Sequence, residues 1–274
     1  MLGYFNPASW QFGILLGVVC VSLSSGVLSP LVVSNRMSFF SEAVAHSTLA
    51  GVALGLIMGF DPLLTMIGVG VIVALLIAAL RQRSPLALDT LLGVAMAGAL
   101  AVGVILFQWK VRNYADMDAY LFGRITFLTR DDVIILALVG AAAIAVLAMM
   151  WNRLALLSVS RPLAQSRGLN VGRYDLLLIV LLAVVVCVTV RVVGLLLVNA
   201  LLVIPAAASK NLARSYRSMV WGSLAVAVVS GLAGLFVGDY LKLPVGPAIV
   251  VAAVILFAAS QIIGLRRGRV MAEN

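Results

Sequence analysis

The feature that most constrains the fold is a succession of long apolar runs along almost the whole chain. A helix needs roughly twenty mostly apolar residues to cross a bilayer, and nine segments of the sequence approach that length. We place them at about 12–33, 41–59, 63–80, 86–107, 132–151, 175–190, 194–208, 219–237 and 245–264. The sequence therefore predicts an all-α membrane protein, a polytopic bundle of about nine transmembrane helices forming a single domain over residues 1–274.

The composition excludes most other classes of protein. Of the 274 residues, 64% are hydrophobic and 11% are charged, whereas soluble domains average about 45–50% and about 25%. Soluble enzymes, secreted disulfide scaffolds and disordered chains are excluded. Cys20 and Cys187 both lie in apolar runs, which predicts buried thiols rather than a disulfide. Residues 1–11 contain no Lys or Arg, so we expect the first run to be retained as a span rather than cleaved as a signal.

Charge placement predicts the orientation of the spans. The formal net charge is +9, and basic residues of membrane proteins gather in cytoplasmic loops, so no nucleic-acid partner is needed to explain it. With the N-terminus outside and the C-terminus cytoplasmic, thirteen Lys and Arg residues fall in inner loops and six in outer loops. Joining the two spans around 191–194 would move Lys210, Arg214 and Arg217 outside, so nine spans fit better.

Two loops have unusual sequences. The outer stretch 120–128 is apolar but too short to span, which predicts a segment at the membrane interface or one that re-enters the bilayer. The inner stretch 152–174 is basic and is interrupted by Pro162, Gly168 and Gly172. Two interpretations fit this inner stretch: a juxtamembrane segment held by anionic lipid, or a docking element for a cytoplasmic partner.

The second apolar run contains a carboxylate and the single histidine of the chain. Glu42 and His46 are four residues apart, so a helix places them on one face. A carboxylate and a neutral imidazole suit Zn²⁺, Mn²⁺ or Fe²⁺, and ionisable residues within spans generally mark function. The alternative is a buried Glu–His hydrogen bond that locks two helices together. Gly51, Gly55 and Gly59 follow in a GxxxGxxxG series, which predicts close helix contact on the opposite face.

Three further residues are weaker candidates. Ser84-Pro85 is typical of a helix start, which places Asp89 one turn inside the next helix. Asp89 is either a carboxylate favoured by the helix dipole or a second acidic group on an ion path. Asn199 and Pro205 lie in the short seventh run, where a polar side chain and a helix break are typical of a pore or gate wall.

Several catalytic signatures are absent from the sequence. It contains no GxxxxGK[ST] phosphate-binding loop, so the chain cannot hydrolyse ATP through that motif. It also contains no HExxH or GxSxG motif, which are common in membrane hydrolases. We therefore expect the chain not to be an enzyme.

The segment RMSFFSEAVAHS at 36–47 resembles the second-helix signature of the permease subunit in bacterial zinc, manganese and iron ABC uptake systems. DTLLG at 89–93 is similar to the fourth-helix motif of that family. Further similarities lie at YLFG (120–123), at PLA (162–164) with Gly168, and at GLLLVNALLVIPAA (194–207). They cover nearly the whole chain in order.

The resemblance implies a type II, vitamin B12-importer-like architecture. It implies a homodimer in the bacterial inner membrane, two cytoplasmic ATPase subunits that hydrolyse ATP, and an extracytoplasmic metal-binding protein. The implied coupling segment is about 153–174, and contact with the ATPase falls on Arg161, Pro162, Ala164 and Gly168. The family's metal-handling carboxylate and histidine correspond to Glu42 and His46, although the family commonly has Asp at the first position.

The cargo implied by the resemblance is a divalent metal, with no covalently bound cofactor. The manganese and iron branch often reads His-Ala-Val-Leu-Pro-Gly, whereas this chain reads HSTLAG at 46–51, so the missing Pro favours zinc. We expect zinc to move inward by alternating access. The alternatives are a Mn²⁺ or Fe²⁺ permease, a permease for a chelate such as a siderophore or cobalamin, and a secondary transporter driven by an ion gradient.

Overall fold

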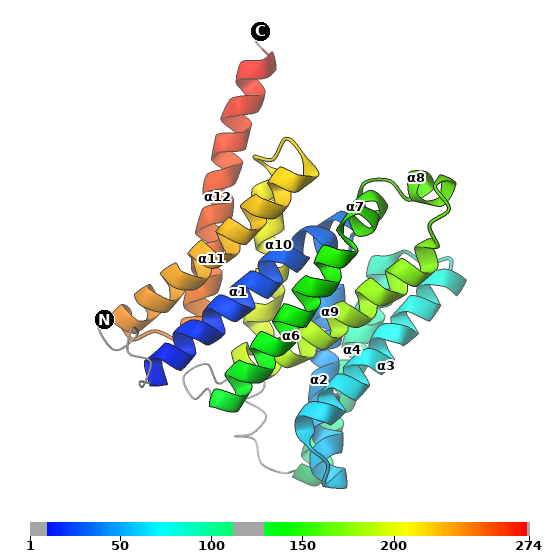
Figure 1. Ribbon diagram of the computed structural model, residues 1–274. Helices are drawn as coiled ribbons and strands as arrows, with labels where there is room; N and C mark the ends of the chain where they lie inside the picture. Colours follow the sequence, from blue (N-terminus) through cyan, green and yellow to red (C-terminus); the bar gives the residue numbers. More distant parts are fainter. Residues whose placement is uncertain (1–9, 112–128, 273–274) are drawn as a thin grey trace. The chain divides into compact units, whose positions relative to one another are not determined.

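The computed structural model describes residues 10–111 and 129–272, and the regular elements in these two ranges are all helices (Figure 1). Their order along the chain is α1 (Trp10–Ser34), α2 (Phe40–Met58), α3 (Pro62–Arg83), α4 (Leu88–Leu106) with its π-helical extension η2 (Phe107–Val111), α6 (Arg130–Met149), α7 (Trp151–Val159), α8 (Arg161–Ser166), α9 (Val171–Val193), α10 (Leu195–Lys210), α11 (Tyr216–Leu241) and α12 (Val245–Ala272). The predicted outer segment at 120–128 lies outside the described residues.

The expected number of spans agrees with the helices of the described ranges. Eight of these helices are long and apolar enough to cross a membrane, and α10 is a shorter apolar helix. The predicted break in the long apolar stretch is confirmed, because α9 ends at Val193 and α10 begins at Leu195. Gly194 separates them with φ +85° and ψ +165°, a backbone conformation that is essentially restricted to glycine.

The chain divides into two compact units that alternate along the sequence. The described part of unit 1 contains α1, α6, α7, α11, α12 and α10 from Ala200 onward. Unit 2 contains α2, α3, α4, η2, α8, α9 and the start of α10. The expectation of one domain over 1–274 stays a prediction.

Helix α2 is the most buried helix of unit 2 and packs against α3, α4 and α9. The glycines of its predicted packing face allow this close contact. A Cβ atom on Gly51 would lie 2.7 Å from the Met66 Cα atom of α3, and one on Gly55 would meet the Thr65 hydroxyl. Gly59 has a different role, since it ends α2 with φ +72°. Two of the three glycines of the series thus make the predicted helix contact.

Unit 1 has a similar close contact between α1 and α11, which run side by side in Figure 1. A Cβ atom on Gly26 would lie 3.0 Å from the Ala227 Cβ atom, and the Ser223 hydroxyl donates a 2.9 Å hydrogen bond to the Gly26 carbonyl. Small residues let the two backbones approach, and a buried hydroxyl then finds its acceptor on the neighbouring helix. This packing needs no charged group in the apolar interior.

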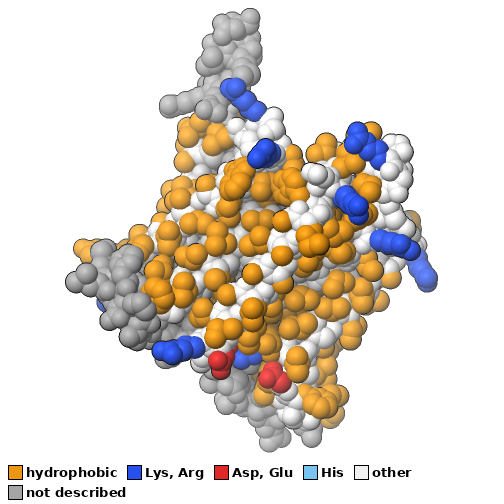
Figure 2. Space-filling view, viewed as in Figure 1, with side chains coloured by type: hydrophobic (Ala, Val, Ile, Leu, Met, Phe, Trp, Pro, Cys, Tyr) orange, Lys and Arg blue, Asp and Glu red, His pale blue; other side chains and the backbone are white. Residues whose placement is uncertain are grey.

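The exposed surface is largely apolar, as a lipid-facing surface requires. In the view of Figure 2 hydrophobic side chains cover most of the described surface, with Lys and Arg side chains toward the ends of helices. Large side chains on α3 and α12, such as Leu64, Ile72, Val251 and Ile255, are more than half exposed. Side chains of this kind are stable in lipid, where exposure of apolar groups costs nothing.

Candidate functional site

Helix α2 places Glu42 in its first turn and His46 one turn later. The Glu42 Oε1 atom lies 3.9 Å from the His46 Nε2 atom, and the side chains are 33% and 15% exposed, respectively. This distance is longer than a hydrogen bond. Both residues belong to the same helix, so the pair does not link two helices as the alternative interpretation required. The predicted juxtaposition of a carboxylate and an imidazole on one helix face is confirmed.

The other imidazole nitrogen of His46 also lacks a partner in the part of the chain that the structure describes. Its Nδ1 atom is buried and has no hydrogen-bond partner among the described residues. A histidine with a purely structural role is normally hydrogen-bonded when it is buried. A Zn²⁺ ion bound at about 2.0–2.1 Å in tetrahedral geometry would need its two ligand atoms about 3.3 Å apart. A small side-chain rotation would bring the Glu42 and His46 atoms to that separation.

Asp89 does not join this pair. Helix α4 begins at Leu88 rather than at Pro85, because Ser84 ends α3 and Ala87 precedes the first turn of α4. Asp89 is exposed in that first turn, where the helix dipole favours a carboxylate. The described residues contain no group of three or more His, Cys, Asp or Glu side chains that could hold a metal ion. The described site thus consists of Glu42 and His46.

Asn199 and Pro205 both lie in the short helix α10. The Asn199 Oδ1 atom is buried and lacks a hydrogen-bond partner within the described ranges. Pro205 lies inside α10, which continues to Lys210, so the expected helix break at this residue is not observed. The backbone N–H of the next residue, Ala206, donates a 3.0 Å hydrogen bond to the Ser29 hydroxyl of α1. Helix α10 thus contains a buried amide oxygen without a partner in the described ranges, and its role as a gate wall stays a prediction.

The predicted coupling segment folds into the short helices α7 and α8 and the turn that follows. Pro162 lies in the first turn of α8, and Ala164 is completely buried. Gly168 adopts φ +75°, and the N–H groups of Gly168 and Leu169 donate to the carbonyls of Gln165 and Ala164, at 2.9 and 3.1 Å. This pattern is a Schellman motif, in which glycine stops the helix.

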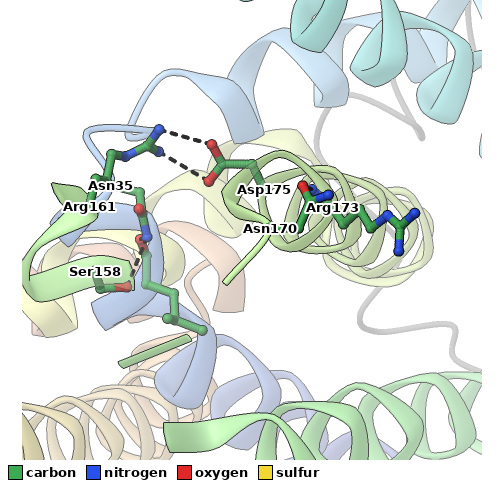
Figure 3. A network of polar contacts seen from close by, with 7 residues as sticks. Asn35, Ser158, Arg161, Asn170, Arg173 and Asp175 are labelled. Atoms are coloured by element: carbon green, nitrogen blue, oxygen red, sulfur yellow. Dashed lines mark hydrogen bonds and ion pairs between the residues drawn. The ribbon is translucent and has the colours of Figure 1, made fainter. Parts of the chain in front are cut away.

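Three residues that sequence reasoning did not single out hold this segment in place (Figure 3). Asp175 of α9 accepts two hydrogen bonds from the Arg161 guanidinium, at 2.9 and 3.1 Å. The Asn35 side chain, which follows α1, donates a 3.0 Å hydrogen bond to the Ser158 hydroxyl of α7. Partners 14 and 123 residues apart leave no periodic signal in the sequence. Only the charge of Asp175 in a basic region offered a hint.

Comparison with known proteins identifies the family. The model described as the ABC 3 transport family matches residues 10–264. The chain is 29% identical to the "High-affinity zinc uptake system membrane protein ZnuB" of Haemophilus influenzae, over 91% of this chain and 95% of that protein. It is 31% identical to the "Manganese import system permease protein ScaB" of Streptococcus parasanguinis, over 90% of this chain and 88% of that protein.

Solved structures agree with this assignment. PsaBC of Streptococcus pneumoniae, solved in complex with Fab, superposes with a TM-score of 0.88 at 28% identity, over 100% of this chain and 98% of that chain. A second structure is "An inward-facing conformation of a putative metal-chelate type ABC transporter". It superposes with a TM-score of 0.74 at 18% identity, over 92% of this chain and 85% of that chain. At this identity it supports the fold alone. The predicted all-helical, type II importer fold is confirmed. The chain therefore belongs to the ABC 3 transport family, as a membrane permease subunit that is not itself catalytic.

Proposed function

We propose that the chain is the permease through which a bacterial ABC importer moves zinc into the cytoplasm. Relatives named for zinc and for manganese are 29% and 31% identical over most of both chains, so the family relationship supports metal import. The preference for zinc rests on the sequence after His46, which lacks the Pro of the manganese and iron branch.

The observation that carries this proposal is the Glu42–His46 pair in a span. The Glu42 Oε1 and His46 Nε2 atoms lie 3.9 Å apart, beyond hydrogen-bond distance, and the buried Nδ1 atom has no hydrogen-bond partner among the described residues. Two protein ligands bind more weakly than the four of a structural zinc site. Weak binding suits transport, because cargo that is held too tightly is not released.

The proposed transport cycle uses alternating access in a homodimer. An extracytoplasmic binding protein delivers the metal, Glu42 and His46 contact it briefly, and two cytoplasmic ATPase subunits drive its release inward. The coupling residues Arg161, Pro162, Ala164 and Gly168 lie on α8 and its C-terminal turn. Pro162 and Gly168 are exposed and available to a cytoplasmic subunit, whereas the buried Ala164 side chain supports the helix from beneath. Asp89 and the α10 residues Asn199 and Pro205 are proposed to line the path.

The test is uptake of radioactive zinc by proteoliposomes that contain the permease, its ATPase and its binding protein. We expect His46→Ala to lower uptake by at least about tenfold, since changing even the partner of a metal ligand costs about 10–100-fold in affinity. Glu42→Asp should retain uptake, because it keeps the carboxylate, whereas Glu42→Ala should not. Met58→Ala, on the exposed end of the same helix, serves as the matched control. Normal uptake by His46→Ala would refute the site.

The same proteoliposomes distinguish the alternative cargoes and mechanisms. Stimulation of ATP hydrolysis by Zn²⁺ but not by Mn²⁺ or Fe²⁺ is the expected result. Stimulation by Mn²⁺ alone would assign the chain to the manganese branch, which relatives of similar identity make the second candidate. A response only to a metal chelate would indicate a chelate permease, and uptake by the purified chain without ATPase would indicate a secondary transporter.

A further inference from the structure

The link between α7 and α8 is held on its two sides by side chains of different units. Ser158, one residue before the end of α7, is bonded to Asn35 in unit 1. Arg161, the first residue of α8, is bonded to Asp175 in unit 2. The chain passes from one unit to the other between Val159 and Ser160. Figure 3 shows both contacts.

The contact in unit 1 is anchored by a well-fixed amide. Asn35 is buried, and its Nδ2 atom donates a 2.9 Å hydrogen bond to the Leu31 carbonyl as well as the 3.0 Å hydrogen bond to Ser158. The amide is therefore held against the last turn of α1, and through Ser158 it fixes the end of α7 to the end of α1. Ser158 takes part in this contact through its hydroxyl group, which accepts the hydrogen bond from Asn35.

The contact in unit 2 is a bidentate ion pair. The Arg161 Nη1 and Nη2 atoms donate to the two carboxylate oxygens of Asp175, whose side chain is 18% exposed. Two parallel hydrogen bonds fix the direction of both planar groups, which a single contact does not. Together with the buried Ala164 side chain, the ion pair fastens α8 to the N-terminal part of α9.

Arg81 at the C-terminal end of α3 is a second cation in the electrostatic field of this carboxylate. It is close enough to be repelled by Arg161 and attracted by Asp175. Its Nη1 atom is buried and lacks a hydrogen-bond partner within the described ranges. Asp175 is thus paired with Arg161 and also attracts Arg81, and loss of its charge would leave the mutual repulsion of the two guanidinium groups less compensated.

We infer that Asp175 and Asn35 are positioning residues that carry a displacement of α8 into both units. The inference rests on the proposed function, in which an ATPase subunit moves α8. Because Ser158 and Arg161 are three residues apart and each is bonded to a different unit, a movement of this link acts on α1 and on α9 at the same time. Neither residue touches the metal, so their loss changes how much metal moves for each ATP hydrolysed.

The experiment measures zinc transported per ATP hydrolysed in proteoliposomes of the complete importer. In Asp175→Asn we expect ATP hydrolysis to continue while the ratio of zinc transported to ATP hydrolysed falls by at least about threefold. Ser158→Ala should also lower this ratio. The charge exchange Arg161→Asp with Asp175→Arg should restore the ratio, because the pair is re-formed. Arg83→Gln, an exposed cation at the same end of α3 as Arg81, is the control and should keep the unaltered ratio.

Three results would overturn the inference: an unaltered ratio in Asp175→Asn, an equal fall in Arg83→Gln, or a charge-exchanged importer that assembles but keeps a low ratio. If Asp175→Asn does not assemble, Arg161→Gln and the charge exchange test the inference by the same criterion. A purely structural role would lower uptake and hydrolysis together and leave their ratio unchanged. Failure of the proposed function is distinct, since the unaltered importer would then transport no zinc at all.

Discussion

At the scale of single residues, Gly194 shows how one position separates two spans. Its φ of +85° with ψ of +165° is sterically open to glycine and strained for other residues. We expect Gly194→Ala to lower the free energy of unfolding by about 1–3 kcal/mol, the usual cost of such backbone strain. The measurement is the Tm of the detergent-solubilised protein.

Gly98→Ala is the matched control for this substitution. Gly98 lies within α4, and a Cβ atom there would meet no described atom within 4 Å. Alanine in a helix interior is favoured over glycine by roughly 0.5–1 kcal/mol, so the control should keep or raise the Tm. An unchanged Tm for Gly194→Ala would show that the break between α9 and α10 tolerates a side chain and does not depend on glycine.

Residue-scale signals also explain which parts of the site could be predicted. Glu42 and His46 are four residues apart, and the helical repeat alone places them on one face, as observed. The contact of Asn35 with Ser158 joins residues 123 positions apart, and no local pattern encodes which distant hydroxyl an amide will meet. Asp175 was missed for the same reason, since its partner is on another helix.

At the scale of elements, helix crossings depend on glycines that leave no room for a side chain. Where α11 crosses α12, a Cβ atom on Gly234 would lie 2.5 Å from the Ile249 backbone nitrogen. Backbone cannot move aside as a flexible side chain can, so Gly234→Ala must push the two helices apart. We expect a loss of about 1–3 kcal/mol in the free energy of unfolding, as for other overpacked interiors, measured as a lower Tm.

Gly238→Ala tests whether the Gly234 effect is one of contact. Gly238 is one turn further along the same face of α11, and a Cβ atom there would lie 3.4 Å from the Ala248 side chain, an ordinary contact. Its Tm should change little. Helix propensity favours alanine over glycine, so equal losses at both positions would mean that the cost does not come from the close contact of Gly234 with Ile249.

Element boundaries were predicted where turn chemistry is local and missed where several signals compete. The interruption of the coupling segment at Pro162 and Gly168 is observed as the start of α8 and its Schellman turn. Ser84-Pro85 looked equally suited to begin a helix, yet Ser84 ends α3 and its hydroxyl accepts a hydrogen bond from the Leu86 N–H in the connecting turn. A capping residue can serve the end of one helix as readily as the start of the next.

At the scale of the whole molecule, the separation of α9 from α10 determines which loops share a side of the membrane. If both cross the bilayer, the α8 turn and the loop after α10 lie on the same side, and the loop after α11 lies on the other. The sixteen residues of α10 are about 24 Å long, somewhat short of the roughly 30 Å hydrocarbon core. The basic residues Lys210, which ends α10, and Arg214, which follows it, favour the cytoplasmic side for this end of the helix.

Cysteine labelling tests this topology in intact cells. Cys20 and Cys187 are replaced by alanine, and single cysteines are then introduced at the exposed positions Ser166, Arg214 and Leu243. A membrane-impermeant maleimide should label Leu243→Cys from outside, and it should label Ser166→Cys and Arg214→Cys only after permeabilisation. Labelling of Arg214→Cys but not of Leu243→Cys in intact cells would contradict the topology. It would mean that α9 and α10 cross the membrane only once between them, which would place the proposed coupling helix and the basic α10–α11 loop on opposite sides.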